Sequence, residues 1–287
     1  MADPNKRLED NVPGAWFVDR TCIDCDACRQ LAPETFDARR GYSVVVRQPR
    51  TAAETREASR ALLACPVGSI GVEGGVRVAS GLFPQALDEA RSVFYCGFNS
   101  ADSYGANSFF ARRDGGNLLF DSPRWTRHLE RAIEKLGGLS DILLTHRDDV
   151  ADAHRYQEAF GARVWIHEAD RTAAAYATDL LRGESPIELR EGLLAIPVPG
   201  HTRGSVVYLL DETFLFSGDS LYWSRHRRTL HASSTYCWYS WERQVESLRR
   251  LRTFRFEWIL PGHGDRARLP AERMREHLKR LLDRAAA

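Results

Sequence analysis

The sequence lacks several features that mark particular classes of protein. No apolar stretch approaches the length of a membrane span, and the 287 residues carry a net charge of only +1. We therefore expect the protein to bind neither a membrane nor nucleic acid. Internal repeats and low-complexity tracts are absent. Lysine is scarce, since only three of the 40 basic residues are lysines, Lys6, Lys135 and Lys279. An arginine excess of this kind indicates no function by itself.

The length and composition fit a globular protein of two domains. Hydrophobic residues make up 43% and charged residues 28% of the chain, which is ordinary for such proteins. The first ten residues, M-A-D-P-N-K-R-L-E-D, hold no apolar core of a secretory signal, so we do not expect a secretory route. The pattern changes after the first quarter of the chain, which predicts a small domain at 1–80 and a larger one at 81–287.

Four cysteines are spaced as ligands of one metal cluster. The run C-I-D-C-D-A-C supplies Cys22, Cys25 and Cys28, and Cys65 follows 37 positions later with Pro66 directly after it. A [4Fe–4S] cluster needs four thiolates that converge on one point. Zinc is the first alternative, but structural zinc sites usually take two separated pairs or a Cys/His mixture. Disulfides are the second alternative and are disfavoured without a secretory signal.

This cysteine pattern resembles that of bacterial-type single-cluster ferredoxins, over about residues 1–78. The surrounding sequence predicts a compact α+β unit with strands at 16–18, 43–46 and 70–78 and a helix at 51–63 that delivers Cys65. So small a unit buries little apolar surface, and binding of a cluster would supply the missing stability.

The rest of the chain alternates between short strands and helices. This texture predicts an α/β fold, a layered sandwich rather than one doubly wound sheet. The predicted strands are at 93–95, 107–110, 117–120, 141–144, 163–166, 193–196, 205–209, 213–216 and 257–260. The predicted helices are at 125–136, 150–160, 169–182, 238–252 and 270–285.

Four of these strands are followed by polar segments with the composition of a metal site. The segments contain T-H-R-D-D-V-A-D-A-H from residue 145, P-G-H-T-R-G-S from 199, S-G-D-S from 217 and P-G-H-G from 261. Loops that emerge at the edge of a sheet are where α/β proteins gather ligands and catalytic groups. Histidine and aspartate from four such loops favour a bound metal ion.

In order and context these segments resemble the metallo-β-lactamase superfamily, over about residues 92–265. The resemblance implies an αββα sandwich, with His201 as a metal ligand, Asp219 as a carboxylate that bridges two metal ions and His263 as a ligand of the second ion. It also implies a supporting role for Asp121 rather than ligation.

One motif departs from this family. The family's first motif is H-x-H-x-D-H, and here His146 stands first, Asp148 replaces the second histidine, and Val150 and Ala151 occupy the Asp-His places. Neither valine nor alanine binds a metal. An added carboxylate shifts the preference toward iron or manganese rather than zinc. Three residues are candidates to fill the gap: Asp149, Asp152 and His154.

We predict one or two divalent metal ions, zinc or iron. Because Asp148 and Asp152 are four residues apart, a helix would place them on one face. The competing interpretation makes Asp148 and Asp149 caps of a helix N-terminus. His154 could face solvent, and His167 is more typical of a helix entry. The predicted metal ligands are His146, Asp148, Asp152, His201, Asp219 and His263, and the predicted catalytic carboxylates are Asp148, Asp149 and Asp219.

The segment 221–241 is rich in aromatic residues and arginine. We interpret Trp238 and Trp241 as core residues of the following helix. We expect a role facing the site for one of Arg225, Arg227, Arg228 and Tyr236, which would grip an anionic group or form a wall. The remaining cysteines, Cys96 and Cys237, have no partner at ligand spacing and are predicted to be buried free thiols.

Together the two sites predict an iron–sulfur metalloprotein. The resemblance favours a metal-dependent hydrolase of a small-molecule ester, thioester, lactone or phosphate, in which Asp219 or one of the 148–152 carboxylates orients water and accepts its proton. Hydrolysis has no obvious need for an electron carrier. The alternatives are therefore a non-haem iron oxidoreductase that draws electrons from the cluster, with a redox partner protein, and a redox or iron sensor with a degenerate site. The cluster and free thiols favour the cytoplasm.

Overall fold

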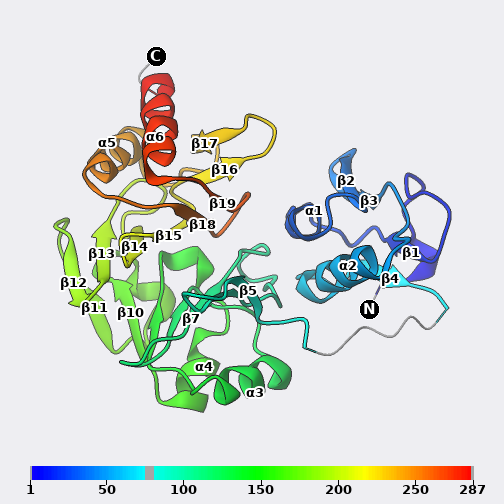
Figure 1. Cartoon of the computed structure of the whole chain (residues 1–287), viewed down its shortest axis with the longest axis horizontal. Coiled ribbons are helices and arrows are strands. Elements are labelled where there is room, and N and C mark those ends of the chain that lie inside the picture. The colour runs from blue at the N-terminus through cyan, green and yellow to red at the C-terminus, as the bar shows by residue number, and fades with distance from the viewer. Residues whose placement is uncertain (1, 75–80, 286–287) are drawn as a thin grey trace.

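The computed structural model describes residues 2–74 and 81–285 (Figure 1). The chain forms a small unit, blue to cyan in Figure 1, followed by a larger unit that runs from green to red. The predicted fold class, an α/β sandwich behind a small α+β domain, is confirmed. Among the described residues, no helix is long and apolar enough to cross a membrane.

The small unit consists of short elements. Two antiparallel pairs, β1 with β4 and β2 with β3, are its only sheets among the described residues, and helices α1 and α2 pack against each other. Helix α2 begins at a capping box in which Thr51 and Glu54 each accept a backbone N–H from the other. The elements are η1 (Pro4–Lys6), β1 (Trp16–Val18), α1 (Ala27–Leu31), β2 (Phe36–Arg39), β3 (Tyr42–Val45), α2 (Ala52–Ala64) and β4 (Ile70–Val72).

The predicted elements of this unit are present at nearly the expected positions. The exception is the strand expected at 70–78. It ends at Val72, and residues 75–80 lie outside the described part of the chain.

The larger unit contains two sheets. The first has seven strands in the order β11-β10-β9-β8-β7-β6-β5, parallel from β8 to β11 and antiparallel elsewhere. Its strands are β5 (Gln85–Asp88), β6 (Val93–Tyr95), β7 (Phe109–Ala111), β8 (Leu118–Phe120), β9 (Asp141–Leu143), β10 (Arg163–His167) and β11 (Asp179–Leu181).

The second sheet has six strands in the order β12-β13-β14-β15-β18-β19, antiparallel except between β15 and β18. Its strands are β12 (Ile187–Arg190), β13 (Leu193–Pro197), β14 (Val206–Leu210), β15 (Phe214–Gly218), β18 (Trp258–Pro261) and β19 (Ala267–Arg268). A separate hairpin, β16 (Tyr222–Ser224) with β17 (Thr229–His231), follows β15.

The two sheets pack face to face with helices outside them. The rings of Phe120 and Phe216, one from each sheet, stack with centroids 3.5 Å apart, and Tyr208 packs on Phe120. Buried residues of α5 and α6 form a second core with the second sheet, so the layers are helix, sheet, sheet, helix. The helices are α3 (Arg127–Lys135), α4 (Ala153–Phe160), α5 (Trp241–Arg250) and α6 (Ala271–Ala285), with short turns η2 (Arg147–Asp149), η3 (Glu168–Ala174) and η4 (Leu251–Thr253).

The helix predicted at 169–182 is wrong. The segment is η3 followed by strand β11, which extends the first sheet in parallel with β10. The hydroxyl of Thr178 accepts a hydrogen bond from the Val164 N–H (2.9 Å), and buried Asp170 bonds to other loops rather than to a helix. Tertiary hydrogen bonds therefore override the local helical pattern.

Candidate metal centres

The four N-terminal cysteines line one small cavity, together with apolar residues such as Val18 and Ile70. Cys22 and Cys25 precede α1, Cys28 lies in its first turn and Cys65 caps the C-terminus of α2. All six cysteines of the chain are free. The structure thus brings together the four residues that the spacing predicts as ligands and gives no support to the disulfide alternative.

The surroundings of these sulfurs suit thiolates bound to a metal cluster. Backbone N–H groups donate to them, from Ser43 to Cys22 (3.4 Å) and from Ser69 to Cys65 (3.3 Å). Burial raises the pKa of the Cys25 thiol to about 12, so four thiolates need positive charge between them. The irons of a [4Fe–4S] cluster supply that charge, and N–H donors to the sulfurs tune such clusters. The residues present fit this group.

The cysteine loop is held by a partly buried arginine. Asp24 and Asp26 adopt left-handed backbone conformations with φ of 56° and 68°. Arg29 reaches back to both carboxylates, with N···O distances of 2.5 Å each, and to the Ser43 hydroxyl at 2.9 Å. These charge-assisted bonds hold the turns between successive cysteines.

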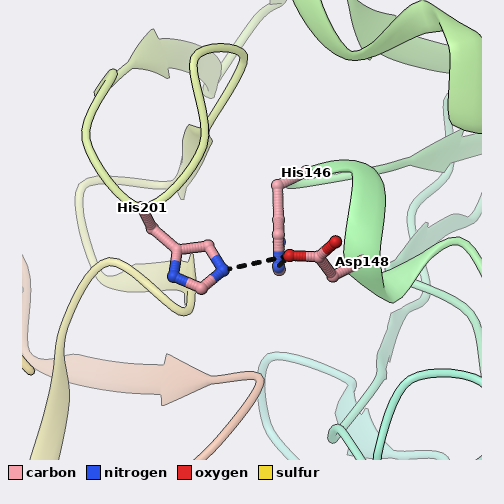
Figure 2. A group of neighbouring side chains, drawn as sticks. All are labelled: His146, Asp148 and His201. Carbon is pink, nitrogen blue, oxygen red and sulfur yellow. Dashed lines mark ion pairs between the residues drawn. The ribbon is translucent and has the colours of Figure 1, made fainter. Parts of the chain in front are cut away.

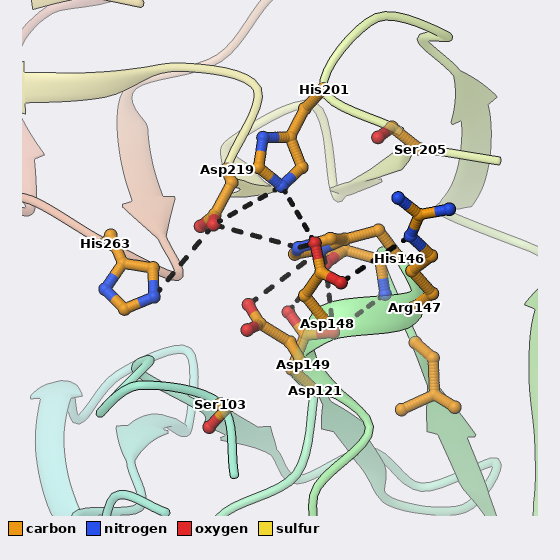
Figure 3. A network of polar contacts seen from close by, with 12 residues as sticks. Ser103, Asp121, His146, Arg147, Asp148, Asp149, His201, Ser205, Asp219 and His263 are labelled. Carbon is orange, nitrogen blue, oxygen red and sulfur yellow. Dashed lines mark hydrogen bonds and ion pairs between the residues drawn. The ribbon is translucent and has the colours of Figure 1, made fainter. Parts of the chain in front are cut away.

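The second centre forms where strands of both sheets end (Figure 3). His146 follows β9, and η2 places Asp148 and Asp149 directly after it. His201 lies between β13 and β14, and the other two residues, Asp219 and His263, follow β15 and β18. Because β15 and β18 are parallel neighbours, their C-terminal residues arrive at the same edge.

The side chains point at one another without forming hydrogen bonds. His201 Nε2 lies 3.3 Å from Asp148 Oδ2 and 3.7 Å from Asp219 Oδ2. His146 Nε2 lies 3.7 Å from the same oxygen of each carboxylate. Figure 2 shows how His146, Asp148 and His201 face a common point. His263 Nε2 is 4.0 Å from Asp219 Oδ2, on the other side of that carboxylate.

Several of these atoms are buried and have no hydrogen-bond partner. Native structures rarely leave such atoms unpaired. Their convergence is therefore evidence for a cation site, and nitrogen and carboxylate oxygen donors suit zinc, iron and manganese. The atoms are His146 Nε2, Asp148 Oδ2, both carboxylate oxygens of Asp149, His201 Nε2 and Asp219 Oδ1.

The far nitrogens of two histidines are held by outer partners. His201 Nδ1 donates to the Tyr236 carbonyl at 2.5 Å, and His146 Nδ1 lies 2.9 Å from the Thr145 hydroxyl. Asp121 accepts from both the backbone N–H and the hydroxyl of Thr145 (2.7 and 3.0 Å). Metal-binding histidines are usually oriented in this way. Asp121 therefore stands where the sequence predicted a supporting residue.

Charge and burial at the centre favour a bound cation. Burial lowers the pKa of His146 to about 4, which leaves its nitrogen neutral and free to bind. Burial and the Asp219 charge raise the pKa of Asp149 well above its usual value. Burial alone would raise the pKa of Asp219, but His263, His146 and His201 outweigh it and hold that pKa low. A divalent ion would stabilise both carboxylates in their ionised forms.

Of the three residues that could replace the missing Asp-His pair of the first motif, the structure places Asp149 in the metal centre. Asp149 lies 1% exposed beside Asp219, and Gly262 leaves room for both carboxylates, since a Cβ there would lie 2.6 Å from Asp149 Oδ2. Asp152 does not join the second metal centre, because its carboxylate accepts a hydrogen bond from the Trp125 N–H at 2.7 Å. His154 is exposed and packs edge-on against Tyr176. Of the predicted ligands, Asp152 is the one that the structure places elsewhere.

Asp170 is a buried residue of this region that the sequence did not reveal. Its carboxylate accepts from the Arg147 N–H (3.1 Å), the Thr202 hydroxyl (2.5 Å) and the Gly204 N–H (3.2 Å). It thereby joins η2 to the loop that carries His201. His167, as predicted, serves the entry of η3, since its side chain accepts from the Ala169 N–H.

The segment 221–241, called the aromatic arm below, differs from its prediction in two places. Trp238 is 56% exposed beside His201, with ring centroids 6.0 Å apart, so its interpretation as a core residue is wrong. Its backbone N–H donates to the His201 carbonyl (2.9 Å), which explains the position outside α5. Trp241 does pack against the second core. Cys237 is only half-buried, whereas Cys96 is fully buried.

The three arginines of the aromatic arm lie in different places. Arg225 extends away from the metal-binding residues to Asp26 of the cysteine loop and Asp265, each at 2.6 Å. Arg227 and Arg228 are exposed in the turn of the β16–β17 hairpin. Tyr236 is 65% exposed and contributes its backbone carbonyl to His201.

The comparison with known families agrees with this geometry. The family model "Metallo-beta-lactamase superfamily" matches residues 102–263, more than half of the chain, and the chain belongs to that superfamily. Residues 18–72 match the family "4Fe-4S single cluster domain of Ferredoxin I". Both resemblances deduced from the sequence are confirmed.

Individual relatives cover only part of the chain. A hydroxyacylglutathione hydrolase of Acidiphilium cryptum (strain JF-5) is 34% identical over 112 residues, 38% of this chain and 46% of that protein. One from Anaeromyxobacter dehalogenans (strain 2CP-C) is 36% identical over 106 residues, 36% of this chain and 34% of that protein. The chain thus spans less than half the length of each.

Solved structures show the same fold at low identity. The structure of VMB-1 has a TM-score of 0.55 at 16% identity, and the match covers 71% of this chain and 97% of VMB-1. FIM-1 from Pseudomonas aeruginosa, in a mono-zinc form, has a TM-score of 0.51 at 17% identity and covers 70% and 95%. These likenesses concern the fold alone.

Proposed function

We propose that this protein is a metal-dependent hydrolase that cleaves a small thioester or ester and carries a [4Fe–4S] cluster in its N-terminal domain. The observation that carries the proposal is the convergence of unpaired nitrogen and carboxylate atoms at the strand ends. The preference for a thioester comes from the partial relatives named hydroxyacylglutathione hydrolase. Lactones and phosphates remain the other predicted substrate classes for such a centre.

Two groups of residues would hold the metal, zinc or iron. His146, Asp148 and His201 form one group, and His146 with Asp149 and Asp219 forms the other. His263 stands beyond Asp219 and would complete the second position. When bound, a divalent ion lowers the pKa of a water molecule toward neutrality and polarises an acyl oxygen.

Asp148 is best placed to accept the proton of the attacking water. Its side chain is 42% exposed at the opening of the centre, whereas Asp149 is buried. The close approach of His201 holds the pKa of Asp148 below its usual value, so Asp148 is ionised and able to orient water at neutral pH. Asp219 lies between the histidines and would help to keep their nitrogens directed at the ion.

The second candidate is a redox reaction at an iron centre. The observation that favours it is contact between the two sites, since Tyr104 bonds to the cysteine loop and packs against His263. In that case the cluster would pass electrons from a partner protein to the metal centre. Four cluster thiolates and two further free thiols favour a reducing compartment, the cytoplasm, under either proposal.

The test is metal analysis combined with hydrolysis. Full-length protein is purified anaerobically, its iron, sulfide and zinc are measured, and release of thiol from simple acyl thioesters is followed. We expect about four irons with sulfide, together with zinc or extra iron. We expect His201→Ala to lose that additional metal and at least about a hundredfold in rate.

His154→Ala is the matched control, because it removes an exposed histidine outside the centre. It should retain metal and rate. A protein that binds no metal beyond the cluster would overturn the proposal and favour a sensor. Bound iron in place of zinc, with no thioester cleavage, would favour the redox alternative.

A further inference from the structure

One loop, residues 99–107, lies between the two metal sites. It connects β6 to β7 and contacts the cysteine loop at one end and the strand end that carries His263 at the other. Ser103 of this loop is among the polar residues around the second centre in Figure 3. Hydrolysis, the first proposed function, does not by itself explain why the loop should touch both sites.

The contact with the cysteine loop is close. Gly105 lies against Cys25, and a Cβ at Gly105 would come 2.9 Å from Cys25 Cβ and 3.0 Å from its Sγ. The neighbouring Tyr104 hydroxyl donates a hydrogen bond to the Ile23 carbonyl, between the first two cysteines. Only glycine can occupy position 105 without displacing a cluster ligand.

The contact with the second centre is made by Asn107. Its backbone N–H donates to the Gly262 carbonyl (2.7 Å) and its side-chain amide to the Pro261 carbonyl (3.2 Å). The same amide also donates to Gln30 Oε1 on α1 (3.3 Å). One buried side chain thus bonds to both the helix of the cluster domain and the segment that ends at His263.

The loop between these contacts is internally fixed. The Asn99 amide donates to the Gly105 carbonyl (2.7 Å) and accepts from the Tyr95 hydroxyl (2.6 Å). Tyr104 has a φ of 51°, a left-handed conformation that a non-glycine residue keeps only when its surroundings impose it. We therefore expect the loop to transmit a shift at Cys25 rather than absorb it.

A second connection runs through the aromatic arm. Arg225 bonds to Asp26 of the cysteine loop and to Asp265, two residues beyond His263, at 2.6 Å each. Gly262, which accepts from Asn107, also lies against the carboxylates of Asp149 and Asp219. The position of the cysteine loop is thereby tied to ligands of the second centre by two routes.

We propose that loop 99–107 couples the cluster to the metal centre, with Tyr104 and Asn107 as positioning residues, so that each site strengthens binding at the other. This inference rests on the two metal assignments made above. Such coupling is reciprocal: a cluster that tightens zinc binding must itself respond to zinc. Coupling between two sites of a protein typically amounts to 5- to 150-fold in affinity.

The test uses full-length protein with its cluster in place and zinc as the probe. Tyr104→Phe removes the bond to Ile23, and Gln30→Leu removes the bond from Asn107; both leave every proposed metal ligand intact. Zinc affinity is measured by competition with a chromogenic chelator, and the cluster is followed by visible circular dichroism. We expect the double variant to bind zinc about tenfold more weakly. We also expect zinc to change the cluster spectrum of the unmodified protein more than that of the variant.

Tyr239→Phe is the control, since Tyr239 has a similar exposure (50% against 57% for Tyr104) and phenylalanine keeps the backbone N–H that donates to the His201 carbonyl. It should bind zinc as the unmodified protein does. Unchanged zinc affinity in the double variant, with a cluster spectrum indifferent to zinc, would overturn the coupling. If the unmodified protein bound no zinc or iron at the second centre, the proposed function itself would fall first.

Discussion

The two metal-binding regions support their ligands in opposite ways. The cysteines lie on short elements of a unit whose described sheets have two strands each, and they face one another across a cavity. The histidines and aspartates extend from sheets of seven and six strands, and outer residues such as Thr145 hold them. We therefore expect the first region to depend on its cofactor for its fold, and the second to be organised before any ion binds.

The strongest way to break this comparison is to remove one cysteine. Cys65→Ala deletes the ligand that α2 delivers, so we expect loss of cluster iron, sulfide and visible colour, and unfolding of the small domain. Iron analysis and limited proteolysis measure both effects. Cys96→Ala is the control, because it removes a buried cysteine of the larger domain and should keep the cluster. A coloured, folded Cys65→Ala protein would contradict the assignment.

A matched pair of aspartates tests the second region. Asp149→Asn should weaken metal binding by more than about a hundredfold, beyond the usual effect of an outer residue, while the domain stays folded. Asp152→Asn should leave metal binding unchanged, because that side chain serves the Trp125 N–H. Metal titrations and circular dichroism of both variants make the measurement. The reverse order of effects would return Asp152 to the ligand set.

Thr145→Val tests the hydrogen bonds that hold the metal-binding residues from outside the centre. It removes the hydroxyl that contacts His146 Nδ1 and Asp121, and we expect metal binding to weaken about 10- to 100-fold. Thr178→Val, a threonine whose hydroxyl bonds within the first sheet, provides the comparison and should keep its metal affinity. Equal affinities in the two variants would mean that the centre needs no outer hydrogen bond.

The smallest effects come from one substitution made in both regions. Thr51 and Thr126 cap α2 and α3 through the same kind of hydrogen bond, and alanine at either position should cost about 1 kcal/mol. In the small domain this cost should appear as faster loss of cluster colour in mild denaturant. In the larger domain it should appear only as a slightly lower melting temperature. Similar cluster loss in both variants would show that the two regions unfold together.

The sequence predicted those parts of both sites that lie in short motifs. Cys22, Cys25, Cys28 and Cys65 could be assigned because thiolate ligands have few alternative explanations. His201 and Asp219 could be assigned because each follows a strand in a recognisable order. Asp149 could not be separated from Asp152, since the choice depends on which carboxylate reaches Gly262 and which reaches Trp125.

Other features depend on contacts distant in sequence. Trp238 lies outside the core because its backbone bonds to His201, 37 residues earlier in the chain. Asp170 follows a strand as many helix-entry residues do, and nothing in its neighbours announces its bonds to Thr202 and Gly204. Arg225 was one of four residues considered for a role facing the site, but its partner Asp26 lies 199 positions away. No local pattern encodes such pairs.

The packing of Gly105 on Cys25 also bears on how the molecule can be divided. A chain that began at Gly81 would still contain every histidine and aspartate of the second centre. In such a chain the Asn107 amide would lose its partner Gln30. Gly105, which now packs against Cys25, would be exposed. The two domains are consecutive in sequence and also pack against each other through these contacts. A cut between residues 74 and 81 would therefore produce a different surface rather than a smaller copy of the same protein.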